Sequence, residues 1–158
     1  MDRYHWLLVF HMVGAFMVLG GAMMAGIFNI AALRRERPSE VVVLFRLTRY
    51  AVASITAGMV VALAFGLWLV ADVDYVKLSA TWVIVALILW FVANALGGIG
   101  GGRDKRTRAL AEQLAAQGDQ PSAELRARLR DPVSLTLSWG SGLAVVAILA
   151  LMIWKPGA

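Results

Sequence analysis

Long stretches without a charged side chain constrain this chain more than any other feature. Asp, Glu, Lys and Arg are absent from residues 6–33, 50–71, 78–102 and 132–154. A transmembrane helix needs about 20 residues to cross a hydrocarbon core of roughly 30 Å. A charge at its centre would cost about 2.5–3.5 kcal/mol. We therefore predict an all-α polytopic membrane protein, a bundle of four transmembrane helices.

The predicted architecture is a single membrane domain with short connections. It covers residues 1–158, with spans at about 6–33, 45–71, 76–97 and 132–154 and a longer connection at 98–131. Ser39 is a suitable N-cap for the second helix. Gly97 and Gly98 are expected to end the third helix, because glycine weakens a helix interior. Asp131 followed by Pro132 is typical of an N-cap and a first helical position, so the fourth span is expected to begin there.

The connection before the last span is the longest polar segment of the sequence. Leu110 and Leu114 are one turn apart, as are Leu125 and Leu129. This spacing predicts two short amphipathic helices that form a helical hairpin. The hairpin could either dock on the bundle or lie on the membrane surface. Both arrangements would bury the leucines and expose the arginines.

The basic residues are distributed unevenly along the chain. Five of the 15 flank the first connection (Arg34, Arg35, Arg37, Arg46, Arg49) and seven lie in the third (Arg103, Lys105, Arg106, Arg108, Arg126, Arg128, Arg130). Cytoplasmic connections of membrane proteins carry an excess of Lys and Arg. We therefore expect these two connections in the cytoplasm and both termini outside, in the plasma (cytoplasmic) membrane, the inner membrane of a bacterial cell. The net charge of +5 then reflects topology rather than binding of nucleic acid.

Arginines next to the spans are candidates for contact with lipid headgroups. Those predicted to make such contacts are Arg46, Arg49, Arg106 and Arg108. A basic side chain near an anionic membrane surface gains about 1 kcal/mol. Anionic lipids at the cytoplasmic face are therefore the expected partner.

The spans offer little chemistry for catalysis. The chain has no cysteine, and no acidic residue lies inside a charge-free stretch. Thiolate ligands and disulfides are therefore excluded. Acid–base pairs and carboxylate-bridged metals cannot be assembled within the membrane. We predict no catalytic residue and no metal centre of this kind, so the sequence favours a protein that is not an enzyme.

Small residues predict where helices pack closely. Ser54, Gly58, Ala62 and Gly66 recur every four residues in the second span, and Gly14 and Gly21 lie in the first. Such a pattern allows close approach of two helix backbones in a membrane. Two interpretations stay open: packing within the bundle, and contact with a second copy or a partner membrane protein.

His11 is the one histidine expected inside the bundle. It precedes Gly14 on the small-residue face of the first span. Polar residues buried in a membrane are functional candidates by default. His11 could be a neutral imidazole bonded to a neighbouring helix, or it could bind haem or a metal. Seven methionines would supply soft ligands for copper(I).

Two short motifs resemble a known group of proteins. The segment Tyr4-His5-Trp6-Leu7-Leu8 leads into His11-Met12-Val13-Gly14 and Gly20-Gly21, and Thr81-Trp82 opens the third span. These motifs resemble small four-span bacterial integral membrane proteins related to copper-resistance protein D and to HemJ-type protoporphyrinogen oxidases. The resemblance implies b-type haem with His11 as an axial ligand. The lysine that HemJ-type proteins carry in the third span is replaced by Ala86, so the oxidase's charged site is not reproduced.

Three functions of different classes follow from these observations. The first is an accessory or small-molecule-handling bundle without catalytic machinery. The second is a b-type haem-binding redox or haem-pathway protein that uses His11. The third is a copper-handling or transport protein. The sequence leaves the cofactor unknown, with haem b as the candidate.

Overall fold

The computed structural model describes residues 2–72 and 79–155 of the chain. Every regular element in these ranges is an α-helix: α1 (Arg3–Leu33), α2 (Pro38–Asp72), α3 (Thr81–Ala116), α4 (Ala123–Leu129) and α5 (Pro132–Trp154). Four helices are long and apolar enough to cross a membrane. The predicted fold class, an all-α bundle of four spans, is confirmed.

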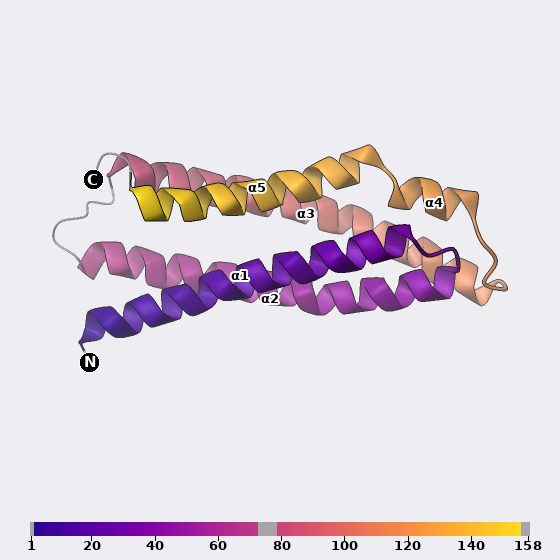
Figure 1. Ribbon diagram of the computed structural model, residues 1–158, viewed down its shortest axis with the longest axis horizontal. Coiled ribbons are helices and arrows are strands. Elements are labelled where there is room, and N and C mark those ends of the chain that lie inside the picture. The colour runs from indigo at the N-terminus through magenta and orange to yellow at the C-terminus, as the bar shows by residue number, and fades with distance from the viewer. Residues whose placement is uncertain (1, 73–78, 156–158) are drawn as a thin grey trace.

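The four long helices run antiparallel as two hairpins (Figure 1). α1 pairs with α2, and α3 pairs with α5. α1 begins and α5 ends at the same end of the bundle, as an even number of spans requires. The opposite end carries the α1–α2 connection and α4, and it holds the two clusters of basic residues. We call it the arginine-rich end.

Glycines allow α1 and α2 to pack closely. A Cβ atom on Gly14 would lie 2.6 Å from the Ala62 nitrogen, and one on Gly58 would lie 2.7 Å from the Gly14 oxygen. Further toward the arginine-rich end, a Cβ on Gly21 would lie 2.8 Å from the Ala51 oxygen. These distances are too short for any larger side chain. The structure therefore places these small residues between α1 and α2 of one chain.

The prediction that Gly97 and Gly98 end the third helix was wrong. α3 is one continuous helix of 36 residues that passes through both glycines and ends at Ala116. A Cβ on Gly97 would meet the Ser141 hydroxyl at 3.4 Å. In a helix interior glycine is only about 1 kcal/mol per residue less favourable than alanine. The contact between α3 and α5 outweighs this cost.

The amphipathic hairpin predicted before the last span takes a different form, because α3 does not end at the two glycines. Its first arm is the extension of α3 beyond the span, and only its second arm, α4, is a separate helix. Of the four leucines named above, Leu125 belongs to a buried cluster with Ala32, Val41, Val42, Phe45 and Ala111, and the other three pack against this cluster. Three helices and α4 thus share one core at the arginine-rich end. In the structure the hairpin docks on the bundle.

A second core joins the two hairpins in the middle of the bundle. It contains Val18 from α1, Met59 from α2, Ala93 from α3 and Ala144 from α5. The Ser141 hydroxyl donates a hydrogen bond of 3.1 Å to the Ala93 carbonyl, which ties α5 to α3 at this level. All four spans therefore belong to one packed unit.

Candidate functional site

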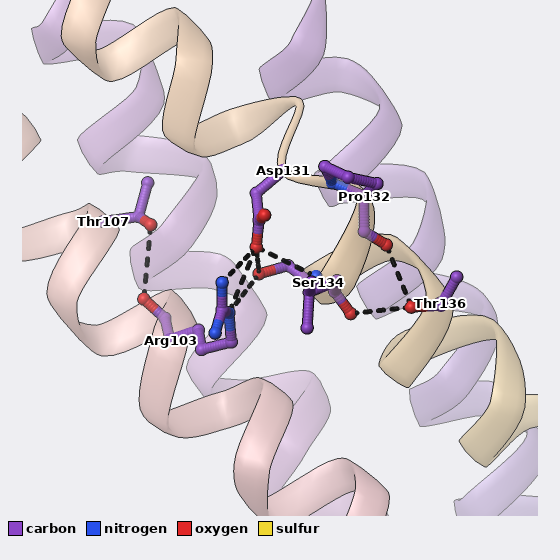
Figure 2. A network of polar contacts seen from close by, with 7 residues as sticks. Arg103, Thr107, Asp131, Pro132, Ser134 and Thr136 are labelled. Atoms are coloured by element: carbon purple, nitrogen blue, oxygen red, sulfur yellow. Dashed lines mark hydrogen bonds and ion pairs between the residues drawn. The ribbon is translucent and has the colours of Figure 1, made fainter.

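Polar side chains gather where the uncharged stretch of α3 ends and α5 begins (Figure 2). Asp131 caps α5 by accepting a hydrogen bond of 3.1 Å from the Ser134 amide and one of 2.9 Å from its hydroxyl. Arg103 of α3 pairs with the same carboxylate and donates from Nε to the Ser134 hydroxyl at 2.9 Å. The Arg103 guanidinium is therefore held in place by α5.

This network lies at the boundary of the apolar part of the bundle. α3 has no charged residue from Thr81 to Gly102, and α5 has none from Pro132 to Trp154. At 1.5 Å per residue the first stretch is about 33 Å long, which matches the hydrocarbon thickness of a bilayer. Arg103 and Asp131 therefore lie at one end of a stretch that is long enough to cross the hydrocarbon core.

A groove opens beside the network. Its volume is about 420 Å³, and it is lined by Arg103, Arg106, Thr107, Glu124, Ala127, Arg128, Asp131 and Ser134. Three guanidinium groups and two carboxylates therefore face one open space. The lining carries a net positive charge, which favours a bound anion.

The three arginines of the groove differ in their partners. Arg103 is paired with Asp131, and Arg128 lies 3.3 Å from Glu124 one helical turn away. Arg106 makes no ion pair with any residue in the described ranges. Since five N–H groups of a guanidinium need acceptors, Arg106 is the lining residue best able to bind an incoming anion.

The structure separates the four arginines predicted to contact lipid headgroups. Arg106 lines the groove. Arg108 instead lies 3.6 Å from Glu112 and is half-buried. Arg46 and Arg49 are exposed on α2, outside the groove. Of the four, Arg106 is therefore the one that lines this groove with other polar groups.

His11 lies between α1 and α2. Its Nδ1 is 2.8 Å from the Ala62 carbonyl oxygen, which can only accept a hydrogen bond. Nδ1 is therefore the donor in this hydrogen bond. The ring packs against Gly66, where a Cβ atom would come within 2.9 Å of it. In the described ranges no three His, Cys, Asp or Glu residues form a group that could hold a metal ion.

Ser54, the remaining residue predicted to pack, also lies in the α1–α2 interface. Its hydroxyl donates a hydrogen bond of 3.2 Å to the Met17 carbonyl. Together with Gly14, Gly21, Gly58, Ala62 and Gly66, it brings α1 and α2 of the same chain together. These residues are therefore already covered within one chain and are not available for contact with a second copy.

Comparison with known proteins gives the family. Residues 5–156 match the family described as predicted integral membrane protein, DUF2269. The chain belongs to this family. The match covers all four spans, and it gives no evidence for the expected relation to copper-resistance protein D or to HemJ-type oxidases. No curated protein and no solved structure matches the chain.

Sequence reasoning about this DUF2269 protein identified Asp131 only as a helix cap. It missed that Arg103 pairs with Asp131 and that α4 brings Glu124 and Arg128 to the same groove. One signal was available: Arg103 is the first charged residue after the third span, and Asp131 is the last before the fourth. Antiparallel spans put such residues at one level, so opposite charges there could have been paired.

Proposed function

We propose that this DUF2269 protein is a non-catalytic membrane protein that binds the phosphate group of an anionic lipid in the groove between α3, α4 and α5. The observation that carries the proposal is the arginine lining of the groove at the level where the charge-free stretches of α3 and α5 end. A phospholipid presents its phosphate at that level. The protein would thereby act as an accessory bundle that handles one lipid.

The arginines suit a phosphate for a geometric reason. A guanidinium is planar and can donate two parallel hydrogen bonds to a phosphate. Arg103 is held by Asp131 and Ser134, so less side-chain freedom is lost when a ligand binds beside it. Arg106 is exposed and has no partner among the described residues, so we assign it the direct contact with the phosphate.

The proposal contains no catalytic step. The two carboxylates that line the groove are Glu124 and Asp131. Glu124 lies 3.3 Å from Arg128, and Asp131 accepts hydrogen bonds from Arg103 and Ser134. The hydrogen bonds from Arg103 and Ser134 lower the pKa of Asp131, which makes this carboxylate a weaker base.

The proposal includes an orientation in the membrane. Twelve of the 15 basic residues lie toward the arginine-rich end, which we place in the cytoplasm. Both termini would then be outside the plasma membrane. The groove would face the cytoplasmic leaflet, whose anionic lipids attract basic residues.

The test compares lipids and variants in detergent solution. A ligand that binds only the folded state raises its stability, by about 2.7 kcal/mol at a hundredfold excess over its Kd. Phosphatidylglycerol should therefore raise the Tm of the wild-type protein more than phosphatidylcholine with the same acyl chains. Inorganic phosphate, added alone, shows whether the headgroup phosphate is sufficient without the lipid.

Arg106→Gln should abolish most of this difference between the two lipids. Lys105→Gln is the matched control, because it removes the same charge from an exposed neighbour that does not line the groove. Equal stabilisation by both lipids would contradict the proposal. So would an equal loss in both variants, which would indicate attraction by overall charge instead of a site.

A second candidate function is b-type haem binding through His11. The observation in its favour is the hydrogen bond from Nδ1 to the Ala62 carbonyl, because metal-binding histidines commonly donate their other ring N–H in this way. Nε2 would then be the atom that takes one axial position of a haem, which would supply one-electron chemistry. A reduced-minus-oxidised spectrum of protein from haem-replete cells tests this candidate.

A Soret band that is lost in His11→Ala would support haem binding, and the lack of a band would exclude it. Metal analysis of the same preparation tests whether the protein binds copper, as the third function considered for this sequence would require.

A further inference from the structure

Asn94 is a polar residue in the apolar part of α3. It lies nine residues before Arg103, which is about 14 Å along the helix axis. Its side chain is exposed, and one amide hydrogen is donated to the Trp90 carbonyl at 2.8 Å. The second amide hydrogen and the side-chain oxygen have no partner within residues 2–72 and 79–155. Asn94 therefore presents a donor and an acceptor to the surroundings of the bundle.

Lipid chains cannot satisfy these groups. An amide that lacks hydrogen-bond partners in an apolar medium costs several kcal/mol. Nothing in the hydrocarbon core besides another protein segment offers both a donor and an acceptor. Asn94 thus favours contact with a second transmembrane helix.

The residues around Asn94 allow such a helix to come close. Leu87, Phe91, Asn94, Gly98 and Gly101 are spaced alternately by four and three residues, which is the 3.5-residue repeat of paired helices. A Cβ atom on Gly98 or Gly101 would meet nothing within 4 Å. α3 contacts α5 through another side, which carries Ala93, Gly97 and Gly100. On the face with Asn94, Phe91, Asn94 and Gly98 are exposed in a single chain, and Leu87 and Gly101 are half-buried.

We propose that two copies of this protein associate through the α3 face formed by Phe91, Asn94, Gly98 and Gly101, with the two Asn94 amides paired. All copies insert into a membrane with the same orientation, so the two α3 helices are parallel and both asparagines lie at one depth. A two-fold axis along the membrane normal then lets each amide donate to the oxygen of the other. This self-complementarity favours a second copy over an unrelated partner.

Disulfide cross-linking tests the contact directly, because the natural chain has no cysteine. Gly98→Cys, in membranes treated with a membrane-permeant oxidant, should form a covalent dimer. Ile99→Cys is the matched control, since Ile99 is 57% exposed at almost the same depth but points about 100° away around the helix. Cross-linking should be clearly faster at Gly98 than at Ile99, because only the former position lies in the proposed contact.

A second measurement leaves the glycines intact. Copies labelled with a donor or an acceptor dye at Gln120→Cys, on the exposed α3–α4 loop, report association by energy transfer in vesicles of varied protein-to-lipid ratio. Asn94→Leu should weaken association about tenfold, whereas Asn94→Gln, which keeps the amide, should stay within about threefold of the parent.

Equal cross-linking at positions 98 and 99 would overturn the proposal. Energy transfer that is lost equally in both Asn94 variants would overturn it too, since the amide would then play no part. A Gly98→Cys adduct with a different protein, in place of the dimer, would show that another partner covers this face. These results are independent of lipid binding in the groove.

Discussion

Ser39 and Asp119 join the two halves of the chain at the arginine-rich end. The Ser39 amide donates a hydrogen bond of 2.7 Å to Asp119 Oδ1, and its hydroxyl donates one of 2.6 Å to Oδ2. Ser39 lies in the first turn of α2, so it is a donor there and not the N-cap expected from the sequence. A carboxylate from the α3–α4 loop satisfies the free amide at this helix end. The loop is thereby held against α2.

The first prediction concerns this pair and pH. The hydrogen bonds from the Ser39 hydroxyl and amide hold the pKa of Asp119 below its ordinary value. A lowered pKa in the folded state means that the contact is fully present above the unfolded pKa, about 3.9, and is lost as pH falls through the folded value. The protection factors of the amides in residues 117–122, which correct for the change of the intrinsic exchange rate with pH, should therefore stay high from pH 8 to about 5 and fall below about pH 4.

Asp119→Ala should remove this protection at neutral pH, whereas Ser39→Ala should remove only part of it, because the amide of residue 39 can still donate to the carboxylate. Since Asp119 accepts both hydrogen bonds, the double variant should be no less protected than Asp119→Ala alone. Additive losses would contradict the pairing. Gln120→Ala, in the same loop, is the control.

The second prediction concerns the α1–α2 interface. Gly14→Ala places a Cβ 2.6 Å from one backbone atom of α2 and 2.9 Å from another, so the helices must separate. We expect a loss of about 1–3 kcal/mol in unfolding free energy in detergent, the usual cost of overpacking. Gly20→Ala is the control, because its Cβ would meet nothing within 4 Å, and alanine favours helix. Similar stability of the two variants would show that this interface is looser than in the structure.

The third prediction separates the two roles of Asp131. Asp131→Ala removes both the cap of α5 and the partner of Arg103, so it should lower the Tm most. Asp131→Asn keeps an oxygen that can accept from the Ser134 amide, but it loses the charge, so it should lower the Tm less. A Tm for Asp131→Asn as low as that of Asp131→Ala would show that the ion pair with Arg103 dominates and the cap contributes little.

The fourth prediction concerns the orientation proposed above. Cysteines that replace Asp74, which lies outside the described residues, and Gly118 in the α3–α4 loop report opposite sides of the membrane. With a membrane-impermeant thiol reagent on intact cells, Asp74→Cys should be labelled and Gly118→Cys should not. Labelling at Gly118 alone would reverse the orientation and place the groove outside.

The four spans could be predicted because their signal is local in the sequence. Each uncharged stretch independently meets the length and polarity that a bilayer imposes. Small residues such as Gly14 and Gly58 could likewise be picked out from their spacing. Their partner could not, since a packing face inside one chain and a face between two copies have the same residue pattern.

Only the tertiary structure decided where the third helix ends. Gly97 and Gly98 weaken a helix locally, but contact with α5 and the core around Ala111 keeps α3 continuous to Ala116. Local propensity amounts to about 1 kcal/mol per glycine, and packing along a long helix exceeds it.

The sequence by itself thus determined the membrane class, the number of spans and the small residues of close helix contact, because bilayer thickness and polarity act on each segment separately. The tertiary structure decided the groove and the Ser39–Asp119 contact. Arg103 and Asp131 are 28 positions apart, and Ser39 and Asp119 are 80 apart. Such contacts depend on how the helices pack and where their ends meet, which no single segment encodes.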